Sequence, residues 1–236
     1  RRRMGETALT LARAAKYEGA GTCEFLLDSR RRFYFLEVNA RLQVEHPVTE
    51  MVTGIDLVKE QISIASGNRL SVHQDDLRWN GHAIELRICA EDPFLNFAPS
   101  TGSISGVRLP AGPGVRVDSD LVPGSEVSVY YDSLVAKLVC WGRDRTDAID
   151  RALRALRETV IVGVSTTIPF HLQLLADARF REGRFHTRFV ETEFSLKDAK
   201  AEHSLDAALL AAAMEFQRRD QVTPKFLSPR PLSSWK

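Results

Sequence analysis

The sequence lacks an excess of charge of either sign, a set of paired cysteines and any long apolar run. Its 32 Lys and Arg residues balance 31 Asp and Glu residues, so the net charge of +1 gives no reason to expect nucleic acid or a membrane as partner. The three cysteines show no CxxC spacing, which argues against a disulfide framework or zinc site and favours a reducing compartment. No apolar run approaches the roughly 20 residues that span a bilayer, and no signal-like segment stands at the start.

What is present is an ordinary globular composition, with 44% hydrophobic and 27% charged residues in a chain of 236. This length suits one large domain or two small ones. The segment MGETALTLARAAKYEG places Ala8, Leu11, Ala12 and Ala15 on one face, which predicts a helix. The segments GTCEFLLD and RFYFLEVN alternate in polarity and are separated by a short polar stretch, which predicts a hairpin.

Further along, the patterns predict two short helices, in VTEMVTG and IDLVKEQISIASG, and strands in GHAIELRICAED and DSLVAKLVCWG. Residues 93–130 are rich in Gly and Pro, which predicts small strands joined by turns. The segment TDAIDRALRALRETV predicts an amphipathic helix that Thr146 can cap, and helix plus loop is expected over 165–190. From about residue 195 the chain turns polar, with an isolated Ala/Leu-rich helix and an aperiodic Pro/Ser segment, so a boundary is expected there.

The hairpin carries two glutamates that a symmetric turn would place opposite each other, Glu24 and Glu37. Simple alternation also puts Phe33, Phe35, Glu37 and Asn39 on one face. Like charges directly opposite are unfavourable in a sheet, so something must compensate. A bound divalent cation would do so, with Asn39 adding a carbonyl oxygen. Two glutamates on a solvated sheet face are the alternative interpretation.

Polar residues follow the second strand at every other position, namely Arg41, Gln43 and Glu45. A guanidinium binds anions in a bidentate manner, and a glutamine with backbone amides can complete a pocket for a small oxyanion. Glu45 would lie beside that anion as a candidate general base. His46 precedes Pro47 and is interpreted as a turn anchor rather than a catalyst. The order of metal site, anion clamp and base suits phosphoryl transfer to a small anion.

The segment EVNARLQVEHPVTEMVTGIDLVKEQ resembles the signature of biotin carboxylases in the ATP-grasp superfamily. The segments GHAIELRICAEDP, FAPSTG and YYDSLVAKL, and the helix at 146–159, resemble the same family in the same order. The resemblance implies an α+β fold. Residues 1–80 would be the C-terminal part of an ATP-grasp domain, an antiparallel sheet with helices, and residues 81–194 the biotin carboxylase C-terminal domain. Residues 195–236 would be a helix and a Pro/Ser linker towards a missing downstream domain.

The implied activity is carboxylation of biotin on a carrier domain, with bicarbonate activated by ATP and Mg²⁺ or Mn²⁺ through carboxyphosphate. From spacing alone, Arg87 beside Glu85 is a surface pair of little energetic weight, and Lys137 could be an edge-strand lysine. The resemblance gives Arg87 a role in holding bicarbonate and the biotin enolate. By position, it implies Glu24, Glu37 and Asn39 as metal ligands; Glu24, Leu26, Leu36 and Glu37 in the ATP site; Arg41, Gln43, Val44 and Arg87 around bicarbonate or biotin; and Glu45, Arg41 and Arg87 as catalytic residues.

The expected partners are a biotin carboxyl carrier domain and a carboxyltransferase subunit. The C-terminal segment resembles the corresponding passage in α subunits of acyl-CoA carboxylases of the methylcrotonyl or propionyl type. Residues 107–117 fall where bacterial biotin carboxylases make dimer contacts, and Arg116 matches an interface arginine, so a homo-oligomer is a further expectation. The expected location is the cytoplasm, or the mitochondrial matrix in a eukaryote. Neither nucleic acid nor a membrane is an expected partner.

The family's N-terminal domain, glycine-rich lid and ATP-binding lysines have no counterpart in this sequence. The chain is therefore expected to hold half of an active site and to be inactive alone. Two alternatives stay open. One is another ATP-grasp ligase that uses paired carboxylates for magnesium, and the other is a non-catalytic fragment that serves assembly. The sequence does not indicate which acyl-CoA, or whether pyruvate, receives the carboxyl group.

Overall fold

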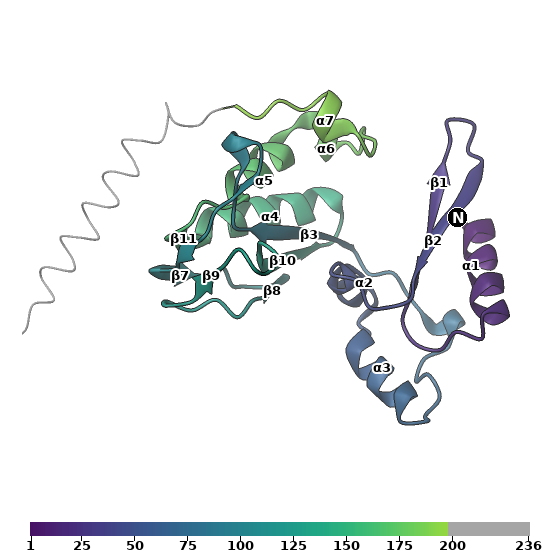
Figure 1. The fold of residues 1–236 in the computed structure, drawn as a ribbon. Helices are drawn as coiled ribbons and strands as arrows, with labels where there is room; N and C mark the ends of the chain where they lie inside the picture. Colours follow the sequence, from purple (N-terminus) through teal and green to yellow (C-terminus); the bar gives the residue numbers. More distant parts are fainter. Residues whose placement is uncertain (198–236) are drawn as a thin grey trace, which may run out of the picture. The chain divides into compact units, whose positions relative to one another are not determined.

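A computed structural model describes residues 1–197 of the chain (Figure 1). The N-terminal part begins with a helix and an antiparallel hairpin, and two short helices and a 3-10 turn follow. The bounds of these elements are α1 (Arg2–Ala14), β1 (Thr22–Leu27), β2 (Phe33–Asn39), α2 (His46–Thr53), α3 (Leu57–Ala65) and η1 (Gln74–Asp76). Helix, hairpin and short helices lie where the periodicity predicted them.

The hairpin contains a β-bulge that the sequence pattern did not predict. Glu24 pairs with Glu37, as a symmetric turn requires, but Phe25 pairs with Phe35, so Leu36 is the extra residue. A bulge places two successive side chains on nearly the same side of the strand. The expectation that Phe35 shares a face with Glu37 is therefore wrong. Phe25 instead makes edge-to-face contacts with Phe33 and Phe35 on the opposite face.

The C-terminal part is built on a three-stranded antiparallel sheet of order β3-β10-β8. Its strands are β3 (His82–Cys89), β8 (Val115–Asp118) and β10 (Leu134–Gly142). Since β10 is the central strand, Lys137 is not an edge-strand lysine. Small two-stranded pairs lie around this sheet: β4 (Glu91–Asp92) with β5 (Ala98–Pro99), β6 (Gly102–Ser103) with β9 (Glu126–Val127), and β7 (Gly106–Arg108) with β11 (Val160–Val162). The remaining elements are η2 (Pro93–Leu95), α4 (Arg145–Glu158), α5 (Ile168–Ala176), α6 (Ala178–Arg181) and α7 (Phe189–Thr192).

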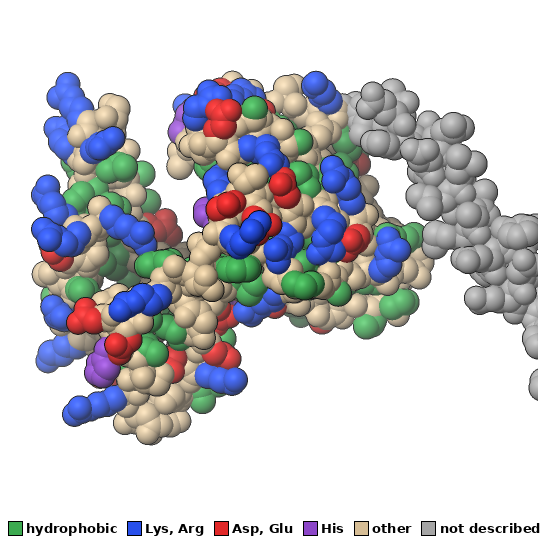
Figure 2. All heavy atoms as spheres, turned by 180° about the vertical axis from the view of Figure 1, so that it is seen from behind, with side chains coloured by type: hydrophobic (Ala, Val, Ile, Leu, Met, Phe, Trp, Pro, Cys, Tyr) green, Lys and Arg blue, Asp and Glu red, His purple; other side chains and the backbone are tan. Residues whose placement is uncertain are grey.

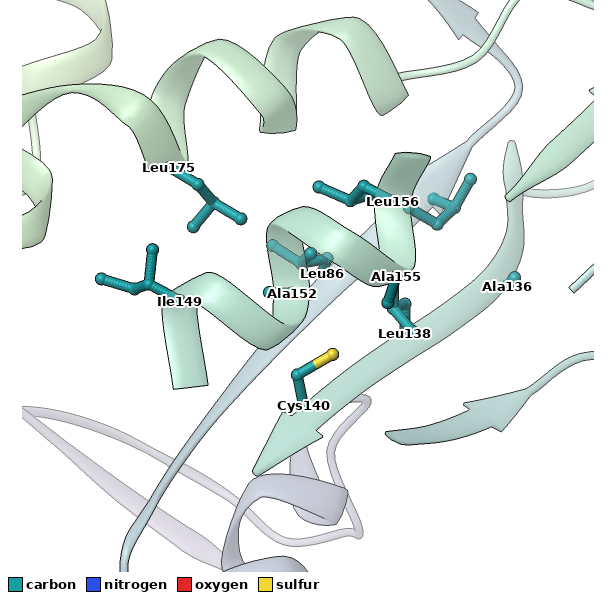
Figure 3. Packing of buried hydrophobic residues seen from close by; sticks show 10 residues of the cluster. Leu86, Ala136, Leu138, Cys140, Ile149, Ala152, Ala155, Leu156 and Leu175 are labelled. Atoms are coloured by element: carbon teal, nitrogen blue, oxygen red, sulfur yellow. The ribbon is translucent and has the colours of Figure 1, made fainter. Parts of the chain in front are cut away.

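One face of the sheet forms the core with α4 and α5 (Figure 3). The buried residues come from alternate positions of β3 and β10, as expected for a half-buried sheet, and from one stripe of α4. Alanines in that stripe let α4 approach closely, and a Cβ at Gly142 would lie 2.3 Å from the backbone nitrogen of Ala148. The cluster consists of Leu86, Ile88, Ala136, Leu138, Cys140, Ile149, Ala152, Ala155, Leu156 and Leu175.

The other face of the same sheet is polar and packs against α2. By alternation it carries Glu85 and Arg87 from β3, Lys137 and Val139 from β10, and Arg116 and Asp118 from β8. Five of these six side chains are ionisable, which is unusual for a sheet face covered by another element. This face positions the candidate site.

Two details of the helices differ from expectation. Asp144, not Thr146, caps α4, because its carboxylate accepts a hydrogen bond from the Asp147 backbone. Val160, the last residue of the segment that was expected to be helical, begins β11 instead. The isolated helix and Pro/Ser linker expected over 195–236 lie almost wholly outside the described residues.

The surface carries mixed charge. In Figure 2, basic and acidic side chains are interspersed over the visible face, in keeping with the small net charge. Within residues 1–197, no helix combines the length and apolarity needed to cross a bilayer.

Candidate active site

The paired glutamates of the hairpin are joined by an amide. The Asn39 side-chain nitrogen donates to Glu24 Oε1 at 2.8 Å and to Glu37 Oε1 at 3.4 Å. Gln43 also donates to Glu24 Oε1, at 3.4 Å. Two of the predicted site residues, Asn39 and Gln43, thus converge on the Glu24 carboxylate, and the amide donors offset the repulsion between the two glutamates.

This group of side chains fits a magnesium ion that arrives with a nucleotide. Two carboxylates, and an amide that can turn its oxygen inward, are hard oxygen ligands of the kind Mg²⁺ prefers. Among the described residues, no cluster of three or more His, Cys, Asp or Glu side chains could hold a metal by itself. Mg²⁺ commonly takes one or two carboxylates and completes its shell with phosphates and water, so Glu24 and Glu37 suffice.

The bulge brings apolar surface to the same face as the carboxylates. Leu26 follows Glu24 by two positions, and the bulged Leu36 precedes Glu37, so all four side chains lie on one side of the hairpin. Leu26 and Leu36 are 58% and 52% exposed. An exposed apolar patch beside a cation site suits the flat base of a nucleotide whose phosphates carry the cation.

The segment after the hairpin is held by its own turn and by the sheet. The His46 ring nitrogen Nδ1 lies 2.8 Å from the Gln43 carbonyl oxygen, which fits the interpretation of His46 as a turn anchor. The Lys137 ammonium donates to the Val44 carbonyl at 3.3 Å. Arg41 is exposed and contacts only the adjacent Leu42 carbonyl, at 3.2 Å, among the contacts described. Its guanidinium is therefore available to an anion.

Glu45 and Arg87 meet across the boundary between the two parts. Arg87 Nη2 lies 2.8 Å from Glu45 Oε2. Glu45 stands at the N-cap of α2, whereas Arg87 projects from the polar face of β3. The structure therefore brings two of the residues expected to be catalytic into direct contact. A carboxylate, which can act as a base, and a guanidinium, which can bind an anion, are thus adjacent at an exposed surface.

A network of ion pairs that sequence reasoning missed fixes α2 to the sheet. Glu50 accepts from Arg116 Nη1 at 2.6 Å and from the Leu57 backbone at 2.7 Å, and its side chain is only 9% exposed. Arg116 also makes a bidentate pair with Asp118, which lowers the pKa of that carboxyl. Asp118 in turn lies 3.4 Å from the Lys137 ammonium. The only signal in the sequence was the spacing of Arg116 and Asp118, which places both on one strand face.

The role expected of Arg116, contact with a second copy, is not tested by these contacts. They show that its guanidinium is engaged within the chain, with Glu50 and Asp118.

The backbone of Arg87 is fixed from behind by the start of α5. The Thr167 hydroxyl donates to the Arg87 carbonyl at 3.1 Å, and His171 Nε2 contacts the same oxygen at 2.9 Å. Burial lowers the pKa of His171, so the ring is neutral and Nε2 carries the donated proton. This support orients Arg87 without occupying its guanidinium.

Paired carboxylates on a hairpin, followed in the chain by a guanidinium and a further carboxylate, form the pattern by which the sequence resembles the ATP-grasp class of ligases. Comparison with known families agrees. Residues 1–73 match the carbamoyl-phosphate synthase L chain, ATP binding domain, and residues 85–192 match the biotin carboxylase C-terminal domain. The chain belongs to the biotin carboxylase family.

Individual relatives are similar over most of this chain. It is 54% identical over 193 residues to Biotin carboxylase 1 of Bacillus subtilis, covering 81% of this chain and 43% of the relative. It is 41% identical over 250 residues to the mitochondrial methylcrotonoyl-CoA carboxylase subunit alpha of Mus musculus, covering 99% of this chain and 35% of the relative. The chain thus spans less than half the length of these relatives.

Solved structures show the same fold. The biotin carboxylase domain dimer of 2-oxoglutarate carboxylase from Hydrogenobacter thermophilus, in complex with MgADP, ADP and bicarbonate, superposes with a TM-score of 0.79 at 48% identity. The match covers 81% of this chain and 42% of that one. The α+β fold expected from the sequence is confirmed.

Proposed function

We propose that this chain supplies the C-terminal share of the active site of a biotin carboxylase, which carboxylates carrier-bound biotin with ATP and bicarbonate. The observation that carries the proposal is the Arg87–Glu45 contact of 2.8 Å beside the paired carboxylates of the hairpin. This contact supports the proposal, because it would put a base and an anion-binding group next to a site that suits a nucleotide-bound cation. We also propose that the ATP-grasp part ends at residue 80 and that the biotin carboxylase C-terminal domain begins at residue 81.

Glu24, Glu37 and Asn39 would hold Mg²⁺ or Mn²⁺, which neutralises phosphate charge when bound. The apolar side chains of Leu26 and Leu36 would contact the base of ATP on the same face. These residues bind and orient the nucleotide, so its terminal phosphate faces the segment that begins at Arg41.

Bicarbonate would be bound by Arg41, Gln43, the Val44 backbone amide and Arg87. Glu45 accepts the bicarbonate proton, and the bicarbonate oxygen then attacks the terminal phosphorus while ADP leaves. The Lys137 contact to the Val44 carbonyl orients this segment. Because Glu45 acts as a base only when its carboxylate is free, the Arg87–Glu45 pair must open as bicarbonate enters. Arg87 then holds negative charge on bicarbonate and later on the biotin enolate.

The type of carboxylase and its partners belong to the proposal as well. The match to methylcrotonoyl-CoA carboxylase subunit alpha covers 99% of this chain, whereas the match to Biotin carboxylase 1 covers 81%. This difference supports an acyl-CoA carboxylase α subunit of the methylcrotonoyl type, working with a biotin carrier domain and a carboxyltransferase, since the propionyl-CoA carboxylase alpha chain of Homo sapiens matches over only 80% of this chain. The cytoplasm, or the mitochondrial matrix in a eukaryote, is the compartment that such a subunit would occupy.

The test joins the N-terminal region of Biotin carboxylase 1 that this chain lacks to residues 1–236, and measures ATP-dependent incorporation of labelled bicarbonate into biotin. We expect activity from the joined protein and none from the chain alone. Glu45→Gln should slow carboxylation by about 10²–10⁴-fold, the usual contribution of a general base, whereas Glu158→Gln, in an exposed ion pair on α4, should leave the rate unchanged. A well-folded joined protein that hydrolyses ATP without carboxylating biotin would overturn the proposal.

A further inference from the structure

The polar sheet face contains a carboxyl group that the proposed reaction does not use, that of Glu85. It lies two positions before Arg87 on β3, so both side chains project to the same face. Across the strand pair, Glu85 faces the fully buried Val139, and Arg87 faces Lys137. Glu85 therefore lies on the same sheet face as the Arg87–Glu45 contact, but away from the exposed surface at which that contact is made.

Both carboxyl oxygens of Glu85 are shielded from solvent and lack a hydrogen-bond partner within residues 1–197. Burial raises the pKa of Glu85 to about 7, although the charges of Lys137 and Arg87 act in the opposite direction. A buried carboxyl without a partner is costly, and one explanation for its retention is a second arrangement of the site that supplies the partner. The shielded position of Glu85 thus needs an explanation that the observed contacts do not provide.

Two of the three cations of this face, Arg87 and Lys137, are directly opposite each other, which is unfavourable unless each has a counter-charge. Lys137 is held by Asp118 at 3.4 Å and by the Val44 carbonyl. Arg87 has Glu45 as its only described ion-pair partner. When Glu45 is released to act as a base, Arg87 loses that partner. The carboxyl on the same strand face that is not already paired is Glu85.

Among residues 1–197, the charged or titratable groups that face Glu85 come from the elements packed around it. They are Arg87 on β3, Lys137 on β10, Arg116 and Asp118 on β8, and Glu45, His46 and Glu50 from the segment and helix that cover the sheet. Arg116 is paired with both Glu50 and Asp118, and Lys137 is paired with Asp118. Among these groups, Arg87 alone both lies near Glu85 and is paired with a residue, Glu45, that the proposed reaction must free.

We propose that Glu85 is a positioning residue, the second partner of Arg87, which receives the guanidinium when Arg87 leaves Glu45. The inference rests on the proposed function, in which Glu45 is the base. In the resting arrangement Arg87 pairs with Glu45 and Glu85 carries its proton. In the released arrangement Arg87 turns towards Glu85, the Glu85 carboxyl ionises, and its proton passes to solvent. Glu45 is then free while Arg87 stays at the anion site.

The test is a titration of the Glu85 carboxyl by ¹³C NMR in residues 1–236, with the signal assigned by Glu85→Gln. Four proteins are compared: the parent chain, Glu45→Ala, Arg87→Gln and the double variant. Removing Glu45 lowers the proton affinity of Glu85 directly, by removing a negative charge, and the Arg87→Gln background measures that direct effect alone. Any additional decrease in the presence of Arg87 reports movement of the guanidinium towards Glu85.

We expect Glu45→Ala to lower the proton affinity of Glu85 by at least about tenfold more with Arg87 present than with Gln at that position. Equal decreases in the two backgrounds would overturn the inference. Glu158→Ala, which frees Arg154 from a similar pair on α4, should leave the titration unchanged. Because no ATP, bicarbonate or biotin is involved, this result is independent of the carboxylation assay. An active joined protein with equal decreases would refute the role of Glu85 alone, whereas an inactive one would refute the proposed function.

Discussion

Arg87 Nη2 lies 2.8 Å from Glu45 Oε2, although 42 positions separate the two residues in the chain. Their side chains are 53% and 49% exposed. An ion pair this exposed contributes about 0–1 kcal/mol to stability, because water screens it and two long side chains are immobilised. Folding therefore gains little from the contact, which agrees with the proposal that it serves to keep a base and a guanidinium adjacent at an exposed surface.

The paired glutamates provide a first prediction. Without metal, Glu37→Gln should stabilise the chain by about 0.2–1 kcal/mol, because it removes the repulsion between two carboxylates that are paired across the strands. In the joined protein, the same change should raise the Mg²⁺ concentration needed for half-maximal activity at least about tenfold. Even residues that only orient a metal ligand lower metal affinity by about this factor when they are replaced. Thermal unfolding and magnesium titration measure the two effects. Glu126→Gln, on β9, is the control. Loss of stability without any change in magnesium dependence would show that Glu37 is structural.

The network around Glu50 provides a second prediction. Glu50→Gln should lower the free energy of unfolding by about 2 kcal/mol, because it leaves the Arg116 guanidinium without one of its charged partners in a nearly buried position. Urea unfolding of residues 1–236 measures the change, with the exposed Glu158→Gln as the matched control. A decrease no larger than that of the control would mean that α2 does not depend on this network.

Much of the architecture could be predicted from the sequence because it depends on local periodicity. The hairpin, the two short helices, the strand around Arg87 and the helix after Gly142 all have clear patterns. The bulge at Leu36 could not be predicted, since the alternating run FYFLEVN reads continuously through it. For the candidate site, too, features that depend on local pattern could be predicted and features that depend on tertiary packing could not. The pairing of Glu24 with Glu37 came from local symmetry, whereas the contact of Arg116 with Glu50 arises only when α2 packs on the sheet.

The raised pKa of Glu85, about 7, provides a third prediction. In the unfolded chain Glu85 has an ordinary carboxyl pKa near 4.5. Between pH 4.5 and about 7 the folded chain therefore keeps a proton on Glu85 that the unfolded chain has lost. Folding stability from this group is therefore complete below the unfolded pKa and is lost as pH rises to about 7. The variant Glu85→Gln cannot ionise at this position. Its free energy of unfolding, measured with urea, should exceed that of the parent by about 1–2 kcal/mol at pH 8 and should be similar to it at pH 5. A difference that does not depend on pH would show that Glu85 is ionised throughout.

The central claim is that Glu45 and Arg87, from two parts of the chain, form one bicarbonate site. A double-mutant cycle of Glu45→Gln and Arg87→Gln on the rate of biotin carboxylation by the joined protein tests it most directly. Residues that act as a unit are strongly non-additive, so the double variant should be about as slow as the slower single variant. Arg154→Gln with Glu158→Gln, a pair of similar length and exposure, should give rates near the parent. If the two single losses multiply in the double variant, Glu45 and Arg87 act independently and the shared site is contradicted.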